Sequence, residues 1–159
     1  MIELTNSVRV NAPGVAVRLD RSDVWRGLVW KAEEPMPFVP SITECTIVSR
    51  DASGFVRDIV DFGEPVRERV TLEPKERVVF ERISGRVRGT IRNEIDDADG
   101  ELQLRFTFAL EVEGAVPGGP EEQAVRDGMG SGYLDAVEST LAAVRERVAL
   151  ERRGPVPAA

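Results

Sequence analysis

The side chains best placed for acid–base chemistry in this sequence are those of Tyr133, Glu68 and Asn93. Tyr133 is the only tyrosine, and it falls on one helical stripe with Ala136 and Val137. Its hydroxyl can donate a hydrogen bond to a ligand carbonyl or act as a weak acid. It can equally belong to a core aromatic residue whose hydroxyl reaches a backbone group or the surface.

Glu68 has the apolar neighbours Val66 and Val70 on the same face of a strand with a period of two residues. A carboxylate that points into an apolar cavity has a raised pKa and can serve as a general base or acid. The alternative is a β-bulge that shifts the register, so that Glu68 pairs with an arginine at the surface.

Asn93 shares a strand face with Ile91 and Ile95, which makes it a candidate polar anchor in a pocket. A buried asparagine needs hydrogen-bond partners, so it can equally hold a neighbouring strand or an ordered water. Other polar residues in strand-like segments are Glu44, Arg57 and Arg92. The direction of Glu44 stays open because the residues around it do not alternate cleanly.

The sequence contains no histidine, which excludes Ser-His catalysis, a histidine general base and a histidine-ligated zinc site. Its single cysteine, Cys45, can form neither an intramolecular disulfide nor a cysteine-only metal site, and we expect it to be an unreactive strand residue. Asp96, Asp97 and Asp99 crowd a turn but lack the spacing of a calcium loop, so an acidic hairpin turn is predicted. We therefore expect no metal and no cofactor.

The composition is that of an ordinary globular protein of 159 residues, with 42% apolar and 31% charged residues. A net charge of −7 argues against a nucleic-acid partner, which would require a basic face. No signal peptide is visible, and no apolar run reaches the roughly 20 residues that span a bilayer. These features predict a cytoplasmic protein that does not insert into membranes, and they leave the oligomeric state open.

Hydrophobic periodicity divides the chain into a strand, a helix, six strands and a long final helix. The first helix is expected at 21–33, with Asp20 and Asp23 forming a capping box and with Trp25, Leu28, Val29 and Ala32 on its buried face. The predicted strands are 3–10, 42–50, 55–62, 66–73, 77–83, 87–95 and 102–113, and the last helix runs from 121 to about 153.

Short turns between the strands favour an antiparallel meander. The predicted fold class is α+β, a curved antiparallel sheet of about seven strands around a long C-terminal helix, with a short helix after the first strand. One domain is expected over 1–153, followed by a frayed tail at 154–159. Gly128, Gly130 and Gly132 weaken the start of the last helix, so that part should be non-helical, kinked or closely packed.

Four segments carry a family resemblance: 25–28 (WRGL), 38–42 (FVPSI), 67–74 (RERVTLEP) and 100–108 (GELQLRFTF). With the order of elements, they make the chain similar to the START-like or SRPBCC superfamily, whose members have the helix-grip fold. The closer resemblance is to the small AtaL-like family, named after the acetylaranotin biosynthesis cluster protein L. The resemblance covers nearly the whole chain, but its motifs are packing and turn residues and identify no catalytic set.

The resemblance implies a hydrophobic tunnel between the sheet and the C-terminal helix. The residues expected to bind a ligand there are Trp25, Trp30, Phe38, Val70, Phe106, Phe108, Met129, Tyr133 and Val137. One of the two tryptophans is expected in the core, and the other at the pocket entrance.

Three functions follow as hypotheses. The leading one is binding of a hydrophobic small molecule, such as a polyketide, lipid or aromatic metabolite, possibly in secondary metabolism. The second is a cofactor-free polyketide cyclase, aromatase or isomerase, with Tyr133, Glu68 and Asn93 as catalytic residues. The third is a protein-interaction module like the chaperone-activating relatives of this fold.

Overall fold

The protein consists of one curved antiparallel sheet and two helices, and the computed structural model describes residues 1–153 apart from the side chain of Ala98. The elements are β1 (Ile2–Arg9), α1 (Arg21–Glu33), β2 (Ile42–Asp51), β3 (Gly54–Asp61), β4 (Glu64–Glu73), β5 (Arg77–Arg82), β6 (Val87–Ala98), β7 (Glu101–Val112) and α2 (Pro120–Arg152). The seven strands are ordered β1-β7-β6-β5-β4-β3-β2. This is the predicted helix-grip fold, and the tail predicted at 154–159 lies outside the described residues.

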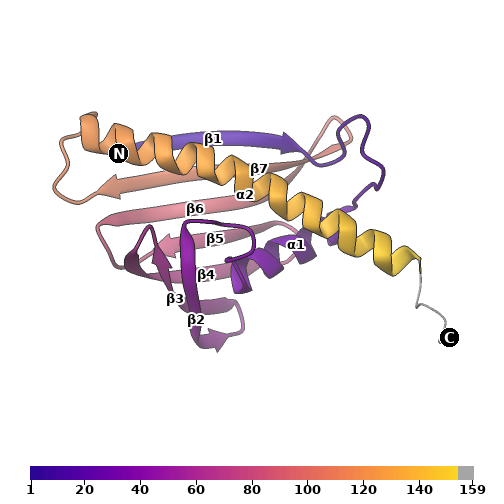
Figure 1. The fold of residues 1–159 in the computed structure, drawn as a ribbon, viewed down its shortest axis with the longest axis horizontal. Coiled ribbons are helices and arrows are strands. Elements are labelled where there is room, and N and C mark those ends of the chain that lie inside the picture. The colour runs from indigo at the N-terminus through magenta and orange to yellow at the C-terminus, as the bar shows by residue number, and fades with distance from the viewer. Residues whose placement is uncertain (154–159) are drawn as a thin grey trace.

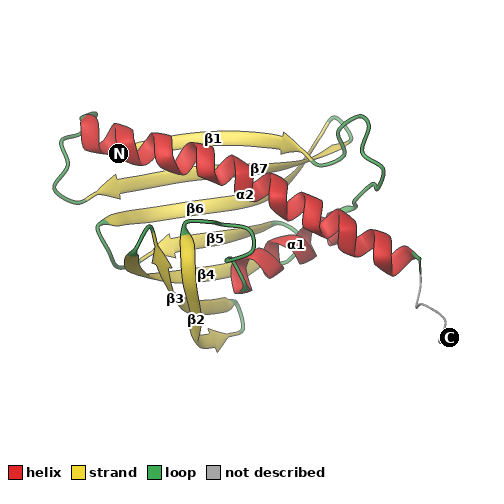
Figure 2. Ribbon diagram, in the orientation of Figure 1, coloured by secondary structure: helices red, strands yellow, loops and turns green. Residues whose placement is uncertain are grey.

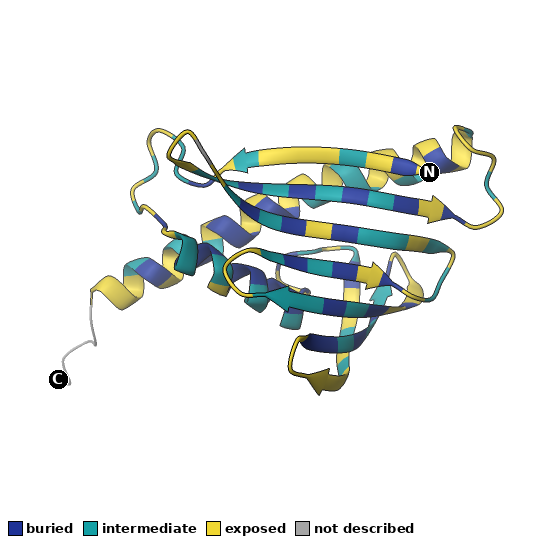
Figure 3. Ribbon diagram, turned by 180° about the vertical axis from the view of Figure 1, so that it is seen from behind, coloured by how far each residue is buried: buried dark blue, intermediate teal, exposed yellow. Residues whose placement is uncertain are grey.

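The helix α2 crosses the concave face of the sheet over β1, β7 and β6, and α1 packs beside its C-terminal half (Figures 1 and 2). The strands β2, β3 and β4 curl around the other end of the sheet. Along β7 buried residues alternate with partly buried ones, as the period of two predicts (Figure 3). No helix in the described part of the chain is both long and apolar enough to cross a membrane.

Local signals set the ends of several elements as the sequence predicted. The side chain of Asp20 accepts a hydrogen bond from the backbone of Asp23, whose side chain accepts one from the backbone of Asp20, so the capping box is confirmed. Between β6 and β7, Asp99 and Gly100 have φ angles of 55° and 76°, the left-handed pair of a tight hairpin.

The buried face of α1 differs from the predicted one. Leu28 and Ala32 are buried as expected, but Trp25 and Val29 are only half-buried. The other buried residues of the helix are Asp23, Val24, Gly27 and Lys31. A side chain at Gly27 would overlap Val144 of α2, so the glycine lets the two helices approach closely.

The glycine-rich start of α2 is helical without interruption. A β-carbon at Gly130 would lie 3.2 Å from the side chain of Leu4, so this glycine accommodates β1. At Gly128 and Gly132, by contrast, no atom beyond the adjoining residues and backbone of α2 lies within 4 Å of the position that a β-carbon would occupy. The predicted close packing therefore occurs at Gly130. Gly128 and Gly132 adjoin open space instead.

The core divides into two parts of unequal size. The larger part lies beneath the middle and the C-terminal half of α2 and includes the fully buried Phe55, Phe106 and Phe108. The smaller part consists of Ile42, Ile59 and Val66, on the strands that curl around the far end of the sheet. The candidate site lies at this far end, facing the N-terminal half of α2.

Candidate functional site

A cavity of about 70 Å³ lies where β3, β4 and β5 face the glycine-rich part of α2. Its apolar wall includes Val39, Ile42, Ile59, Phe80, Ile91 and Met129. Its polar lining includes Lys31, Arg57, Asp61, Glu68, Arg82 and Tyr133. This volume holds roughly five water molecules, so the cavity as it stands admits only a small group.

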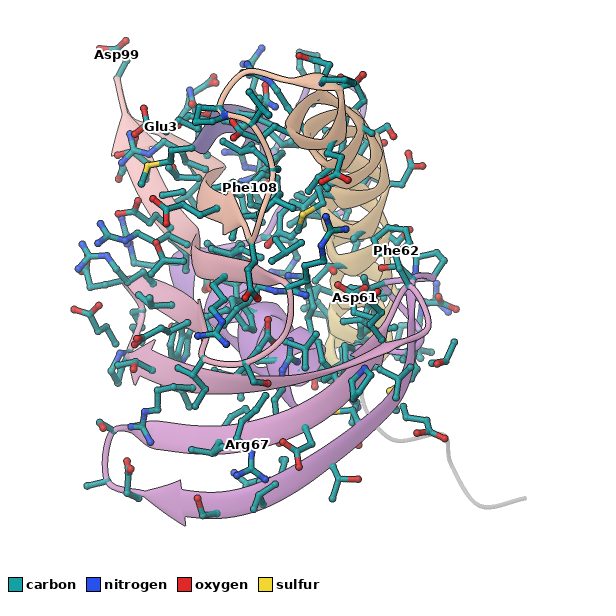
Figure 4. The ribbon with its side chains drawn as sticks, turned by 90° about the vertical axis from the view of Figure 1, so that its left-hand side faces the viewer. Glu3, Asp61, Phe62, Arg67, Asp99 and Phe108 are labelled. Carbon is teal, nitrogen blue, oxygen red and sulfur yellow. The ribbon has the colours of Figure 1, made fainter. Side chains whose placement is uncertain are left out.

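The cavity opens past the β3–β4 turn. Phe62 in that turn is 66% exposed, and it lines both the cavity and an adjoining hollow of about 320 Å³. Gly128, Met129, Asp61 and Arg82 also line both spaces. Figure 4 shows Phe62 and Asp61 on the same side of the molecule as α2. A ligand can therefore reach the inner cavity from the hollow between this turn and α2.

Phe62 has an unusual backbone conformation at this entrance. Its φ angle is 50°, in the left-handed region that bulky side chains rarely adopt, and Gly63 follows at 79°. The two residues form the tight turn between Asp61 and Glu64, which are paired in the sheet. The fold tolerates a strained, exposed phenylalanine at a position where glycine or asparagine would be unstrained.

The first polar group at the cavity is a cluster of Lys31, Asn93 and Tyr133, here called the amine cluster. The Lys31 ammonium Nζ donates to Asn93 Oδ1 at 2.8 Å and to the Tyr133 hydroxyl at 3.1 Å. The Asn93 amide nitrogen donates to the same hydroxyl. Lys31 Nζ also lies 4.8 Å from the centroid of the Tyr133 ring and 5.3 Å from that of Phe80.

Burial changes the protonation of the amine cluster. Lys31 is 4% exposed, and burial together with the nearby Arg57 guanidinium lowers its pKa to about 7, against an opposing effect of Glu68. Burial raises the pKa of Tyr133 well above its usual range, although the hydrogen bond from Asn93 opposes this. At neutral pH the cluster therefore offers an amine that is neutral about half the time beside a phenol that keeps its proton.

The second polar group is a row of charges across three strands, here called the guanidinium row. Arg57 on β3, Glu68 on β4 and Arg82 on β5 are direct neighbours in the sheet register, and Asp61 joins them from the end of β3. All four are more than nine-tenths buried. Two positive and two negative groups balance, which is how buried charges become tolerable.

The contacts of the guanidinium row are specific. Arg57 Nε and Nη2 donate to Glu68 Oε1 at 2.9 and 2.7 Å, and Nη1 donates to the Ala32 carbonyl at 2.7 Å. Arg82 Nη1 donates to Asp61 Oδ2 at 3.1 Å and lies 3.9 Å from Glu68 Oε2. The other carboxylate oxygen, Asp61 Oδ1, is buried without a hydrogen-bond partner in the described part of the protein. Such an acceptor is suited to a hydroxyl or N–H donor of a bound molecule.

The structure brings the three predicted acid–base residues close to the cavity. Tyr133 and Glu68 line it, and Asn93 contacts Tyr133 and Lys31 just behind it. Glu68 points inward and the register is continuous through it, so the bulge alternative does not occur. Its surroundings differ from the apolar ones expected, because Arg57 and Arg82 flank it. Of the other strand residues, Arg57 is buried while Glu44 and Arg92 are exposed.

Of the nine predicted ligand-binding residues, only Met129 and Tyr133 line the cavity. Val70, Phe106, Phe108 and Val137 are fully buried in the core, where they fill the space beneath the middle of α2. That packing closes the sheet–helix space except at the β3–β5 end. A ligand-binding role for these four is untested, and they do not border the cavity.

The aromatic residues around α1 also lie away from the cavity lining. Trp25 packs against the larger core. Trp30 meets Phe38 edge-on, with ring centroids 4.9 Å apart, and the Arg147 guanidinium lies 4.2 Å from the Trp30 ring. Trp30 thus lies between the two helices and not at the cavity entrance.

Sequence reasoning missed Lys31, Asp61 and Arg82 as cavity residues. A signal for Lys31 was present, because it follows Val24 and Leu28 at the i, i+4, i+7 spacing of one helix face. In the strands that contain Asp61 and Arg82, apolar residues occur on both faces. The period of two therefore does not predict which face either side chain lies on.

Comparison with known proteins supports the fold. Residues 4–150 match the family model described as "Acetylaranotin biosynthesis cluster protein L". No curated protein matches the chain.

Two similar solved structures are aromatase/cyclases. One is the Zhui aromatase/cyclase from Streptomyces sp. R1128, with 16% identity, a TM-score of 0.69 and coverage of 92% of this chain and 95% of that one. The other is the di-domain ARO/CYC StfQ from the steffimycin biosynthetic pathway, with 12% identity and a TM-score of 0.72. The match covers 92% of this chain but 52% of StfQ, so the chain spans about half of that protein.

A third similar structure is Ara h 8.0201, with 14% identity and a TM-score of 0.61, covering 90% of this chain and 97% of that one. At these identities the similarity concerns the helix-grip fold alone.

Proposed function

Because this chain belongs to the acetylaranotin biosynthesis cluster protein L family, we propose that it binds a hydrophobic small molecule of the polyketide or aromatic type. The ligand enters through the hollow beside Phe62 and places a polar group in the inner cavity. A cytoplasmic role in secondary metabolism fits a chain with a single cysteine.

The observation that carries the proposal is an apolar cavity containing a small number of convergent polar groups. Ile59, Phe80 and Met129 supply apolar surface, while Asp61 Oδ1 and the Lys31 amine supply an acceptor and a donor. This combination is typical of pockets that orient an amphipathic ligand. It favours a ring system with hydroxyl and carbonyl substituents over a plain fatty acyl chain, since the chain would leave Asp61 Oδ1 without a hydrogen-bond donor.

The glycines of α2 provide the test. A leucine at position 132 projects into the open space beside the cavity, and a leucine at 131 projects from an exposed position next to it. We expect a hydroxylated anthraquinone to bind saturably to the wild-type protein in a fluorescence titration. Gly132→Leu should weaken this binding at least tenfold, and the matched control Ser131→Leu should not change it. Equal affinity of the two variants would contradict the proposal.

A second candidate function is cofactor-free cyclisation or aromatisation, favoured by the protonated Tyr133 hydroxyl beside a partly neutral amine. Closing a ring in a poly-β-ketone requires removal of a proton from a carbon between two carbonyls and protonation of an oxygen. Both are ordinary general acid–base steps, each contributing roughly 10²- to 10⁴-fold. Water loss from a linear poly-β-ketone thioester, followed by mass spectrometry, should be slower in Tyr133→Phe, Glu68→Gln and Asn93→Ala. Full turnover in all three variants would exclude this role.

A further inference from the structure

Lys31 is a buried amine at the cavity, and simple binding uses its N–H groups but not its nucleophilic lone pair. We infer that the Lys31 amine captures a carbonyl group of the ligand covalently as an imine, which makes a ketone or aldehyde at the inner end of the molecule the feature that this site selects. The inference deepens the proposed function and rests on it.

The first support is the setting of the amine. Lys31 is buried, lines the cavity, and has no carboxylate within ion-pair distance in the described part of the chain. Glu68, the acidic group that acts on it, is held by two hydrogen bonds from Arg57. A lysine placed in an apolar pocket beside another cation, and without a counter-ion, is the usual arrangement of amine nucleophiles. Burial of such a residue for packing alone would favour an apolar side chain.

The second support is a proton donor at the correct atom. The Tyr133 hydroxyl lies 3.1 Å from Lys31 Nζ and accepts a hydrogen bond from the Asn93 amide. The Tyr133 ring packs against Phe106 and Phe108, with ring centroids 4.8 Å from each. Figure 4 shows Phe108 between the sheet and α2. A carbonyl that approaches Nζ from the cavity therefore meets a fixed phenol beside the reacting nitrogen.

The reaction balances without any other reagent. The lone pair of neutral Lys31 attacks the carbonyl carbon, the carbonyl π electrons move to oxygen, and Tyr133 protonates that oxygen. The tyrosinate then takes a proton from the new ammonium, which leaves a neutral carbinolamine. A second protonation of the hydroxyl by Tyr133 breaks the C–O bond and releases water, and loss of the nitrogen proton to the tyrosinate leaves the imine. The sum is amine plus carbonyl compound giving imine plus water.

The chain carries its own control, because it contains only two lysines, Lys31 and the exposed Lys75. Pentane-2,4-dione is a suitable probe, since it is a compact diketone and its imine becomes a stable conjugated enaminone. At pH 7 an ordinary lysine is neutral in roughly one molecule in 3,000, against about half for an amine with a pKa near 7. We therefore expect Lys31 to be modified at least tenfold faster than Lys75, even after allowance for its lower nucleophilicity and restricted access.

The measurement is peptide mapping by mass spectrometry during incubation with the diketone, each adduct adding one diketone less one water. Faster modification of Lys31 supports the inference. Equal or faster modification of Lys75, or an unmodified Lys31 when Lys75 has reacted, overturns it. Both lysines are compared within one folded protein, so the result does not depend on a variant that folds.

The pH dependence and the tyrosine provide a further readout. The groups that face Lys31 are Arg57 on β3, Glu68 on β4, Asn93 on β6 and Tyr133 on α2. Tyr133→Phe should slow the modification of Lys31 at pH 7 by roughly tenfold or more, and leave that of Lys75 unchanged. If the substitution lowers the pKa of Lys31 further, the neutral fraction of the amine at pH 7 can only rise, at most from about half to all of it. That change would speed the reaction, so a slower rate reports the loss of the proton donor. An unchanged rate at Lys31 would remove Tyr133 from the reaction.

The two proposals fail separately. If the anthraquinone binds to wild-type protein and to Lys31→Met alike while Lys31 resists the diketone, the covalent step is wrong and the binding function stands. If Lys31 reacts preferentially but no aromatic ligand binds, the amine is reactive and the proposed ligand class is wrong.

Discussion

Replacing Lys31 by methionine should remove a specific pH dependence from the stability of this protein. The pKa of Lys31 is lowered from 10.5 to about 7 by burial and by Arg57. Between these two values the unfolded chain binds a proton at this position that the folded chain does not bind. Stability therefore rises with pH across the window from about 7 to 10.5, and it is independent of this lysine below about pH 6.

The magnitude follows from the two pKa values. With 10.5 in the unfolded state and about 7 in the folded state, protonation of the unfolded chain costs about 4 kcal/mol of stability at pH 7 and about 2 kcal/mol at pH 9. Raising the pH from 7 to 9 should therefore increase the free energy of unfolding of the wild-type protein by about 2 kcal/mol through Lys31 alone. Methionine keeps most of the volume of the side chain and does not titrate.

Urea denaturation at pH 6, 7, 8 and 9, followed by the fluorescence of Trp25 and Trp30, measures this effect. The difference between wild type and Lys31→Met cancels other groups, including Cys45, whose thiol pKa is raised by burial. We expect the wild-type protein to gain about 2 kcal/mol relative to the variant between pH 7 and pH 9. Parallel pH profiles for the two proteins would refute the assignment of Lys31 as a buried, partly neutral amine.

Three further predictions concern the frame of the site. Glu68→Gln should lower the free energy of unfolding by about 3–5 kcal/mol in urea denaturation, because it leaves the buried guanidinium of Arg57 without its counter-charge. A free energy of unfolding within about 1 kcal/mol of the wild-type value would contradict the ion pair. Gly132→Ala should stabilise α2 by up to about 1 kcal/mol and so raise the thermal midpoint. The matched variant Gly27→Ala should lower the midpoint, since a neighbouring side chain already fills the space at position 27 and not at position 132. Stabilisation by both substitutions would contradict the packing of the helices. Phe62→Asn should stabilise the turn by about 1 kcal/mol and weaken anthraquinone binding, and a loss of stability would show that the left-handed backbone is not strained.

Much of the fold follows from local patterns. The period of two in residues 102–112 defines β7, because a strand with one buried face must alternate. The helix α1 begins where Asp20 and Asp23 satisfy the free backbone groups of its first turn. Such signals act over a few residues and do not depend on the tertiary arrangement. The sequence therefore predicted the bounds of the helices and strands to within a few residues.

The direction of polar residues inside strands depends on partners that are distant in the sequence. Period two placed Glu68 on an inward face, but only the register of three strands brought Arg57 and Arg82 beside it. Asp61 lies at the end of β3, where its Oδ1 has no hydrogen-bond partner among the described residues.

By itself, the sequence determined the fold class, the order of elements and the absence of histidine chemistry, because these depend on composition and local spacing. Only the tertiary structure decided where the space between sheet and helix stays open. Phe106 and Phe108 fill the middle of that space, and glycines at positions 128 and 132 leave one end unfilled. The helix α1, which approaches α2 closely at Gly27, carries Lys31 into the lining of that end, and this depends on the fit between two helices more than 100 residues apart.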